Sequence, residues 1–176
     1  VTIAGVRVGH HTDAAARTGC TVVTFPDGTV GSGEVRGGAP ASREFDLLAP
    51  ERAVEEIHAA VLTGGSAFGL ACADGVMRRL EEEGRGVQTV AGPVPIVPTL
   101  ALFDLMVGDP TVRPTAENGY AAAASASDDA ELHGGCLEAW GRPGDGAQFR
   151  LTLPRRRGTE LTSSPLPLVP SDRQEP

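Results

Sequence analysis

The sequence predicts a layered α/β fold in which short strands and helices alternate over about residues 1–136. Two β-branched or alternating runs near the N-terminus predict paired strands, and two later segments with helical apolar spacing predict helices. Hydrophobic residues make up 40% of the chain, which is ordinary for a globular protein, but only 4% are aromatic. Ala, Val and Leu are therefore expected to form most of the core.

The N-terminal segment predicts strands. Residues 1–8 alternate loosely between apolar and polar side chains, and residues 19–25 form a β-branched run that ends in a turn at residues 26–28. Residues 29–35 are expected to return as the second arm of a hairpin, although their glycines weaken that strand. Residues 36–44 contain too much Gly and Pro for regular structure, so they are predicted to form a loop.

The middle of the chain predicts helix, strand and helix. Pro50 suits the first turn of a helix that continues to about residue 59. Residues 60–63 are short and apolar, as in a buried strand. Ser66 is then a good N-cap for a helix that ends near Glu83. The inward stripe of this helix consists of Leu70, Ala73, Met77 and Leu80.

The last third of the chain changes character. Residues 94–97 predict a brief strand between prolines, residues 100–106 a further apolar segment, and residues 117–127, which are rich in alanine, a final helix. Residues 137–176 then hold six of the 14 prolines and six of the 15 arginines, without a usable apolar period. We therefore expect a domain over residues 1–136 and a divergent, poorly ordered Pro/Arg-rich tail over residues 137–176.

Composition disfavours several classes of function. The net charge is −8 and the chain contains no Lys, which argues against a nucleic-acid partner. No apolar run approaches the length of a membrane span, and no signal-peptide pattern is visible. Cys20, Cys72 and Cys136 are odd in number and widely spaced, as expected for free thiols of a cytoplasmic protein. His10 and His11 lack Cys or acidic partners at ligand spacing, so neither a metal nor another cofactor is predicted.

The first candidate site is the segment Gly64-Gly65-Ser66-Ala67-Phe68-Gly69. It lies between a predicted strand and a helix N-terminus, where free N–H groups bind anions or stabilise an oxyanion. A phosphate loop is disfavoured because the GxxxxGK[ST] pattern is absent. Close packing of helix on strand, with Ser66 as a cap, explains the same residues equally well.

The second candidate site is the glycine-rich segment from Arg36 to Glu44. The pair Gly37-Gly38 can bring the backbone close to a ligand, whereas Arg43 and Glu44 can instead form a structural ion pair. Both interpretations remain open from the sequence.

Ser66 does not qualify as a catalytic nucleophile. A nucleophile elbow requires G-x-S-x-G, and Phe68 occupies the position of the second glycine. His58, the one base in the vicinity, belongs to the preceding predicted helix. The sequence therefore nominates no catalytic residue.

Six motifs occur in a fixed order over about residues 1–136. They are Gly5-Val6-Arg7-Val8-Gly9-His10, Thr18-Gly19-Cys20-Thr21-Val22, Arg36-Gly37-Gly38-Ala39-Pro40 with Arg43-Glu44, Leu62-Thr63-Gly64-Gly65-Ser66-Ala67-Phe68-Gly69-Leu70, Ala73-Asp74-Gly75-Val76-Met77 and Val94-Pro95-Ile96-Val97-Pro98. In this order and spacing they resemble the DmpA-like family, which includes L-aminopeptidase/D-Ala-esterases and β-peptidyl aminopeptidases.

This resemblance implies an αββα sandwich similar to the ornithine acetyltransferase fold. Members of the family cut themselves once, and a Ser or Thr at the new N-terminus of the second chain becomes the nucleophile, with its own α-amine as the base. The implied substrates are short peptides, amides or esters with a free amino terminus, and acidic pocket residues would suit that ammonium group.

The resemblance ends before the catalytic part of the family. There the last helix is followed by a Val-Gly-Ala-Gly-Thr-Gly-Ala-type stretch, an Asn-containing strand and the cleavage site. Here His133-Gly134-Gly135 is followed by the unrelated run Cys136-Leu137-Glu138-Ala139-Trp140. We therefore expect an incomplete αββα sandwich: the α-chain-like part of an autoprocessing aminopeptidase, inactive alone.

Other interpretations stay open. The chain can be a small-ligand-binding or regulatory protein that uses the Gly64–Phe68 pocket on the same scaffold. It can also serve in a homo-oligomer, or pair with a β chain. The divergence after Cys136 fits a frame change, a deletion or a genuine tail.

Overall fold

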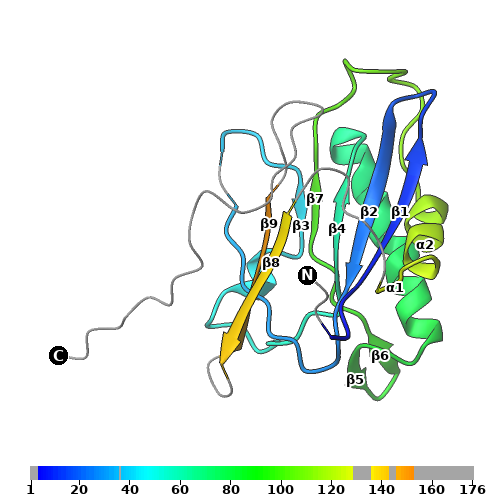
Figure 1. Cartoon of the computed structure of the whole chain (residues 1–176). Helices are drawn as coiled ribbons and strands as arrows, with labels where there is room; N and C mark the ends of the chain where they lie inside the picture. The colour runs from blue at the N-terminus through cyan, green and yellow to red at the C-terminus, as the bar shows by residue number, and fades with distance from the viewer. Residues whose placement is uncertain (1–3, 36, 129–135, 143–145, 153–176) are drawn as a thin grey trace. The chain divides into compact units, whose positions relative to one another are not determined.

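The computed structural model describes residues 4–35 and 37–128, together with the strand segments 136–142 and 146–152. These residues belong to two compact units, one within Thr2–Ala130 and the other within Glu131–Pro176. The larger unit is α+β, with one mixed sheet and two helices (Figure 1).

The larger unit is built on a five-stranded sheet with the order β1-β2-β4-β7-β3. The strands are β1 (Arg7–Asp13), β2 (Thr18–Thr24), β4 (Ala59–Thr63), β7 (Thr99–Ala101) and β3 (Ser42–Arg43). β4 and β7 run parallel, and the other neighbouring strands are antiparallel. A separate small hairpin joins β5 (Val87–Thr89) to β6 (Gly92–Val94).

Two helices, α1 (Cys72–Glu82) and α2 (Ala116–Ala124), cover one face of the sheet (Figure 1). Glycines let their backbones approach closely. A Cβ on Gly75 would lie 1.7 Å from the carbonyl oxygen of Ala116, and one on Gly119 would lie 2.1 Å from that of Cys72. Any larger residue at these two positions would force the helices apart.

The core lies between the sheet and the helices and consists of small side chains, as the composition predicts. Its members are Cys20, Val22, Ala59, Val61, Cys72, Ala73, Val76, Leu80, Val97, Ala122 and Ala123. They come from the alternating inward positions of β2 and β4, from one stripe of each helix and from the segment before β7. Of the stripe predicted for the helix after Ser66, Ala73 and Leu80 are buried, whereas Leu70 and Met77 are only partly buried. Cys72 and Val76, which were not predicted, are fully buried.

The strand predicted over residues 1–8 lies instead at Arg7–Asp13, and the strand predicted over residues 94–97 shares only Val94 with β6. Two further predictions are wrong. The predicted helix over residues 50–59 is absent: the nearest helical turn is η1 (Asp46–Leu48), which precedes it, and Ala59 begins β4. The predicted hairpin arm over residues 29–35 reduces to an isolated bridge between Val30 and Glu56. Both errors have one cause, because backbone bonds such as Ile57 N–H to Thr29 O, 2.9 Å long, hold the two segments extended against each other.

The helix predicted after Ser66 is present but begins differently. Residues Ser66–Ala71 form the 3-10 helix η2, and α1 follows at Cys72. Ser66 is not an N-cap: Gly65 holds that position without a side-chain hydrogen bond. The last predicted helix corresponds to α2, which Thr115 and Asn118 open with a capping box.

The smaller unit contains a hairpin of β8 (Cys136–Arg142) and β9 (Gly146–Thr152). The tail over residues 137–176 was predicted to be poorly ordered, and the two strands of this hairpin fall almost wholly within that range. The remaining tail residues, 153–176, lie outside the described residues, so their predicted poor order stays a prediction.

Candidate functional site

The first candidate segment forms a tight turn at the end of β4. Thr63 is the last residue of the strand, and its hydroxyl donates to the carbonyl of Gly64 at 3.1 Å and contacts Cys72 Sγ at 3.4 Å. The turn then leads through Gly65 into η2. These bonds connect the turn to Cys72, the first residue of α1. The buried core therefore determines the geometry of the turn.

Asp104, which the sequence analysis did not nominate, holds this turn from the other side. Its Oδ1 accepts a hydrogen bond from Gly65 N–H at 2.7 Å, and its Oδ2 accepts one from the Thr18 hydroxyl at 2.8 Å. A Cβ on Gly64 would lie 2.0 Å from the Oδ2 atom. Only glycine therefore leaves room for the carboxylate at position 64.

The backbone of this turn is unusual. Gly65 and Ser66 have φ values of +79° and +55°, and Ser66 is one of the few residues other than Gly with positive φ in the described chain. The N–H of Gly64 donates to the Gly19 carbonyl and that of Ser66 to the Leu102 carbonyl. With Gly65 N–H bound to Asp104, all three N–H groups are used internally. The N–H groups of residues 64–66 are therefore already bonded within the protein, and anion binding at this segment stays a prediction.

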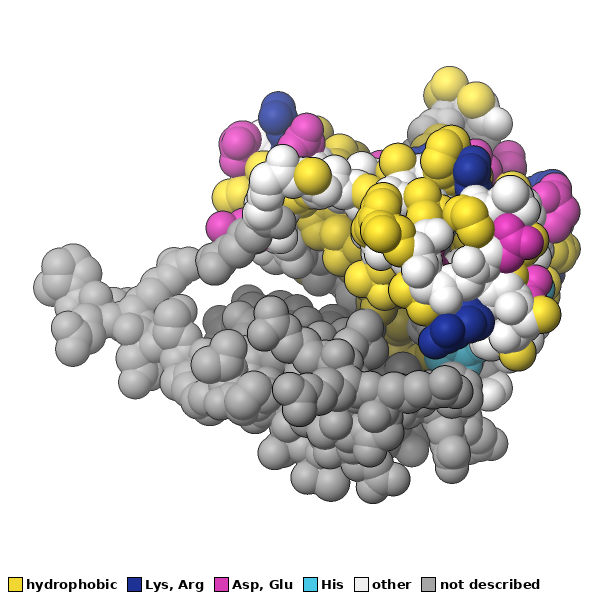
Figure 2. Space-filling model, turned by 90° about the horizontal axis from the view of Figure 1, so that it is seen from above, with side chains coloured by type: hydrophobic (Ala, Val, Ile, Leu, Met, Phe, Trp, Pro, Cys, Tyr) yellow, Lys and Arg dark blue, Asp and Glu magenta, His cyan; other side chains and the backbone are white. Residues whose placement is uncertain are grey.

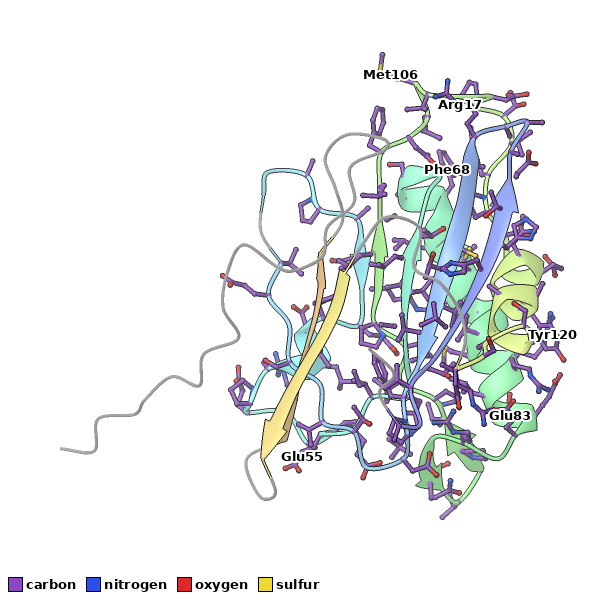
Figure 3. The ribbon with its side chains drawn as sticks, in the orientation of Figure 1. Arg17, Glu55, Phe68, Glu83, Met106 and Tyr120 are labelled. Carbon is purple, nitrogen blue, oxygen red and sulfur yellow. The ribbon has the colours of Figure 1, made fainter. Side chains whose placement is uncertain are left out.

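An apolar rim surrounds the turn. Phe68 is 57% exposed, and the Arg113 guanidinium lies 3.7 Å from the centre of its ring. Figure 3 shows Phe68 and Met106 at the same end of the sheet, and Figure 2, viewed from that end, shows hydrophobic side chains gathered there. The rim consists of the exposed residues Phe68, Leu102, Phe103, Met106 and Val107.

The second candidate segment has structural partners instead. Arg43 does not pair with Glu44; its Nη1 lies 2.6 Å from Asp74 Oδ1, and Glu44 Oε2 accepts from Val97 N–H at 2.8 Å. These bonds attach β3 to α1 and to the segment before β7. Gly37 and Gly38 have open space around their Cβ positions, and no described contact brings them to the Gly64 turn.

His58 lies away from Ser66. It precedes β4, whereas Ser66 follows the far end of this five-residue strand, which spans about 16 Å. The imidazole is buried, and its Nδ1 accepts from Ile96 N–H at 3.2 Å. Burial, followed by the positive charge of Arg85, lowers the pKa of His58. No Ser66–His58 pair forms, in agreement with the sequence analysis.

Cys20 and Cys72 are free, buried thiols that contact each other in the core. The hydrogen bond with Cys72 and burial both raise the pKa of Cys20, so this thiol stays protonated. Among the described residues, no group of three or more His, Cys, Asp and Glu side chains is arranged to hold a metal ion. No described helix has the length and apolar character of a membrane span.

Comparison with known proteins finds the family described as peptidase family S58, which matches residues 1–146. An uncharacterised aminopeptidase of Mycobacterium leprae is 52% identical over 136 residues, covering 73% of this chain and 38% of that protein. The corresponding protein of Mycobacterium tuberculosis is 51% identical over 135 residues, with coverage of 72% and 39%. The chain thus spans less than half the length of these relatives.

Two solved structures share the fold. The PH0078 protein of Pyrococcus horikoshii aligns with a TM-score of 0.59 at 20% identity, over 73% of this chain and 40% of that one. A Burkholderia β-aminopeptidase aligns with a TM-score of 0.51 at 20% identity, over 71% and 37%. In addition, the sensor histidine kinase MtrB of M. tuberculosis is 56% identical over 63 residues, which is 35% of this chain and 11% of that protein.

Proposed function

The chain belongs to peptidase family S58, the DmpA family, and from this membership we propose that it is the α-chain-like portion of an autoprocessing N-terminal-nucleophile aminopeptidase. One observation carries this proposal: the chain matches the family strongly, but the match covers only a part of the relatives' length. Within the aligned region, 52% of the residues are identical to those of the M. leprae aminopeptidase. This region covers only 38% of that protein.

The arrangement at the Gly64 turn supports the same proposal. Ser66 is not paired with His58, which lies at the other end of β4. In an N-terminal-nucleophile enzyme the attacking hydroxyl and its base, the α-amine, arrive together on a second chain. This portion therefore contributes the sheet and one wall of the substrate site, and it does not hydrolyse substrate alone.

We assign the substrate side to the end of the sheet that carries the Gly64 turn and the apolar rim. The turn is rigid, because Asp104 and the core hold it from two sides. The rim offers apolar surface to a small side chain, and Asp104 offers negative charge near a substrate ammonium group. Short peptides, amides or esters with a free amino terminus fit this combination.

The match to the sensor histidine kinase covers a second part of the chain's length. The aminopeptidase match covers 73% of the chain and the kinase match covers 35%. If the kinase match follows the aminopeptidase match along the sequence, the two together cover the whole chain and overlap slightly. We infer this arrangement because unrelated families are not expected to match the same residues at such identity. A shifted reading frame does not produce 56% identity to another protein, so this placement disfavours the frame-change interpretation.

Coexpression tests the proposal. The portion of the M. tuberculosis aminopeptidase that lies beyond the match would be produced with and without this chain, and hydrolysis of amino-acid p-nitroanilides would be measured. We expect activity only when both portions are present and copurify. Stable, monomeric chain that never binds the second portion would instead favour the alternative of a binding or regulatory protein.

A further inference from the structure

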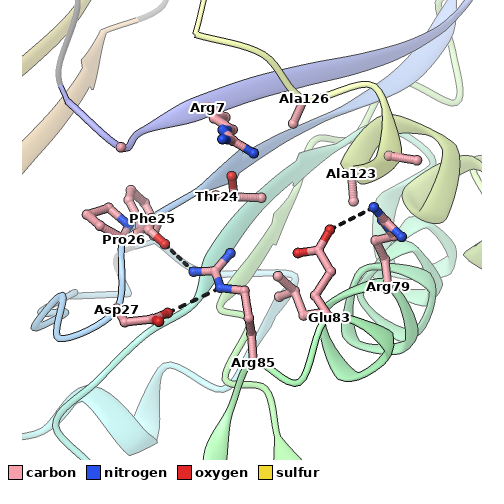
Figure 4. A pocket seen from close by; sticks show the side chains of 13 residues that line it. Arg7, Thr24, Phe25, Pro26, Asp27, Arg79, Glu83, Arg85, Ala123 and Ala126 are labelled. Atoms are coloured by element: carbon pink, nitrogen blue, oxygen red, sulfur yellow. Dashed lines mark hydrogen bonds and ion pairs between the residues drawn. The ribbon is translucent and has the colours of Figure 1, made fainter.

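A hollow lies at the opposite end of the sheet from the Gly64 turn. It has a volume of about 320 Å³ and is formed by the start of β1, the end of β2, and the C-terminal ends of α1 and α2 (Figure 4). β2 links the two ends, since Thr18 at its start binds Asp104 and Thr24 at its end lines the hollow. The two sites are separated by about 20 Å of strand.

Three arginines surround this hollow: Arg7, Arg79 and Arg85. They come from segments far apart in the sequence, in a chain whose net charge is −8. Figure 4 shows their guanidinium groups on different sides of the hollow, with the Thr24 hydroxyl between Arg7 and Arg85. Such convergence of like charges is unfavourable unless carboxylates or a bound anion lie close to them.

Each arginine has a carboxylate partner. Either the partner is more exposed to solvent than the arginine, or the pair leaves some N–H donors of the guanidinium group unused. Arg85 Nε lies 3.2 Å from Asp27 Oδ1, and the Arg85 side chain is 21% exposed whereas that of Asp27 is 81% exposed. Arg85 also donates to the carbonyl of Phe25. Arg79 Nη2 lies 2.8 Å from Glu83, while its Nε is buried with no hydrogen-bond partner among the described residues.

Arg7 is the most accessible of the three. Its Nε lies 3.3 Å from Asp128 Oδ1, at an exposed position where an ion pair contributes little. A guanidinium carries five N–H donors in a planar fork that matches a carboxylate or phosphate. Arg7 and Arg85 can therefore bind an anion between them without giving up Asp128 or Asp27.

The charges that line the hollow select the anion. Two carboxylates, those of Asp27 and Glu83, line the hollow with the three guanidinium groups, and Asp128 and Glu82 lie beside it as partners of Arg7 and Arg79. These carboxylates already neutralise the guanidinium charges, so an anion would be held by the remaining N–H donors, and a monoanion would be repelled less than a phosphate dianion. Leu80 and three alanines from the end of α2 supply an apolar wall for a small substituent.

We propose that this arginine pocket binds a small organic carboxylate, held by Arg7 and Arg85 with the Thr24 hydroxyl, at a site separate from the substrate end of the sheet. The volume lies at the lower end of the range for small-molecule sites. The proposal does not depend on the catalytic assignment, because no residue of the pocket belongs to the Gly64 turn or its rim.

Titration of the full chain followed by NMR tests the proposal. The Nε–Hε signals of the arginines would be recorded while acetate, L-leucine or inorganic phosphate is added at constant ionic strength. We expect acetate and L-leucine to shift the signals of Arg7 and Arg85 with saturation in the range of about 0.1–10 mM, and phosphate to bind at least about tenfold more weakly.

Variants distinguish a built site from general charge attraction. Arg7→Gln should weaken carboxylate binding about tenfold, because one charge-assisted hydrogen-bonding partner is lost. Arg85→Gln should weaken it similarly, with far-ultraviolet circular dichroism to check folding because this residue also binds Phe25 and Asp27. Arg78→Gln, on the same helix as Arg79 but stacked on Tyr120, is the matched control and should change nothing.

Three results would overturn the proposal. They are a linear, non-saturating response to all three probes, equal affinity in the Arg7→Gln protein and the parent, and tighter binding of phosphate than of either carboxylate. The last result would redefine the pocket as a phosphate site.

Discussion

Gly65 N–H donates a 2.7 Å hydrogen bond to the carboxylate of Asp104, 39 residues further along the chain. The second oxygen of the same carboxylate binds Thr18, at the start of β2. One side chain thus joins the turn after β4, the segment after β7 and the strand β2. The shape of the candidate substrate end depends on this side chain together with Gly64, which leaves room for it.

Asp104→Ala should lower the free energy of unfolding by about 1–3 kcal/mol, because it leaves Gly65 N–H and the Thr18 hydroxyl without their acceptor. Asp104→Asn keeps one acceptor oxygen and should cost less. Urea denaturation followed by circular dichroism measures both. The control is Asp109→Ala, whose carboxylate bonds only to Thr111 two residues away. Equal stability of the Asp104→Ala and Asp109→Ala proteins would contradict this assignment.

Gly64→Ala should also destabilise the protein, by about 1–3 kcal/mol, through overpacking against Asp104 and Thr18. Gly38→Ala provides the comparison, because a Cβ there meets open space. Thermal unfolding of the two variants should differ clearly, with Gly38→Ala close to the parent. If Gly64→Ala were as stable as Gly38→Ala, the carboxylate would have to lie elsewhere.

The sequence predicted the layered fold and the central helix with two of its buried positions, Ala73 and Leu80, because these depend on local periodicity. It did not predict Asp104 or the arginine pocket. Asp104 is an acidic residue within the apolar segment of residues 100–107, but its partners lie 39 and 86 positions away. Such long-range pairing has no local pattern.

The wrongly predicted helix over residues 50–59 has a similar explanation. Pro50 and the spacing of Val54 and Ile57 satisfy the rules for a helix, but the chain pairs with residues 29–31 instead. Tertiary hydrogen bonds decided the conformation over local propensity. The positive φ of Ser66 also depends on a tertiary hydrogen bond, which its N–H donates to the Leu102 carbonyl, so the local sequence does not predict it.

The pH dependence of stability should carry a contribution from His58. Its pKa is lowered in the folded state by burial and by Arg85, so below about pH 6.5 the unfolded chain binds more protons there than the folded chain. The stabilising contribution is therefore present above this value and is lost as the pH falls from it toward the lower folded-state pKa.

His58→Gln tests this contribution. Urea denaturation between pH 5 and pH 7 should show a flatter dependence in this variant than in the parent, as should be expected when the titrating group is removed. Val90→Ser, at an exposed position without an ionisable side chain, serves as the control and should retain the parental slope. An unchanged slope in His58→Gln would contradict the inferred shift.

The apolar rim should cause self-association of the isolated chain. Phe68, Leu102, Phe103, Met106 and Val107 are all at least half exposed, and exposed apolar patches favour association. The double substitution Phe103→Ser with Met106→Lys should shift the sedimentation profile toward monomer. Val90→Ser, at an exposed position outside the rim, should leave it unchanged. A monodisperse parent chain at high concentration would argue against an interacting rim.

Turnover by the purified 176-residue chain tests the central claim most directly. The rate of p-nitroaniline release from L-alanine p-nitroanilide would be measured for the parent and for Ser66→Ala. We expect no rate above background in either protein, because removal of a nucleophile and its base costs several orders of magnitude. Hydrolysis by the parent chain that disappears in Ser66→Ala would contradict the account, since Ser66 would then be a nucleophile within this polypeptide.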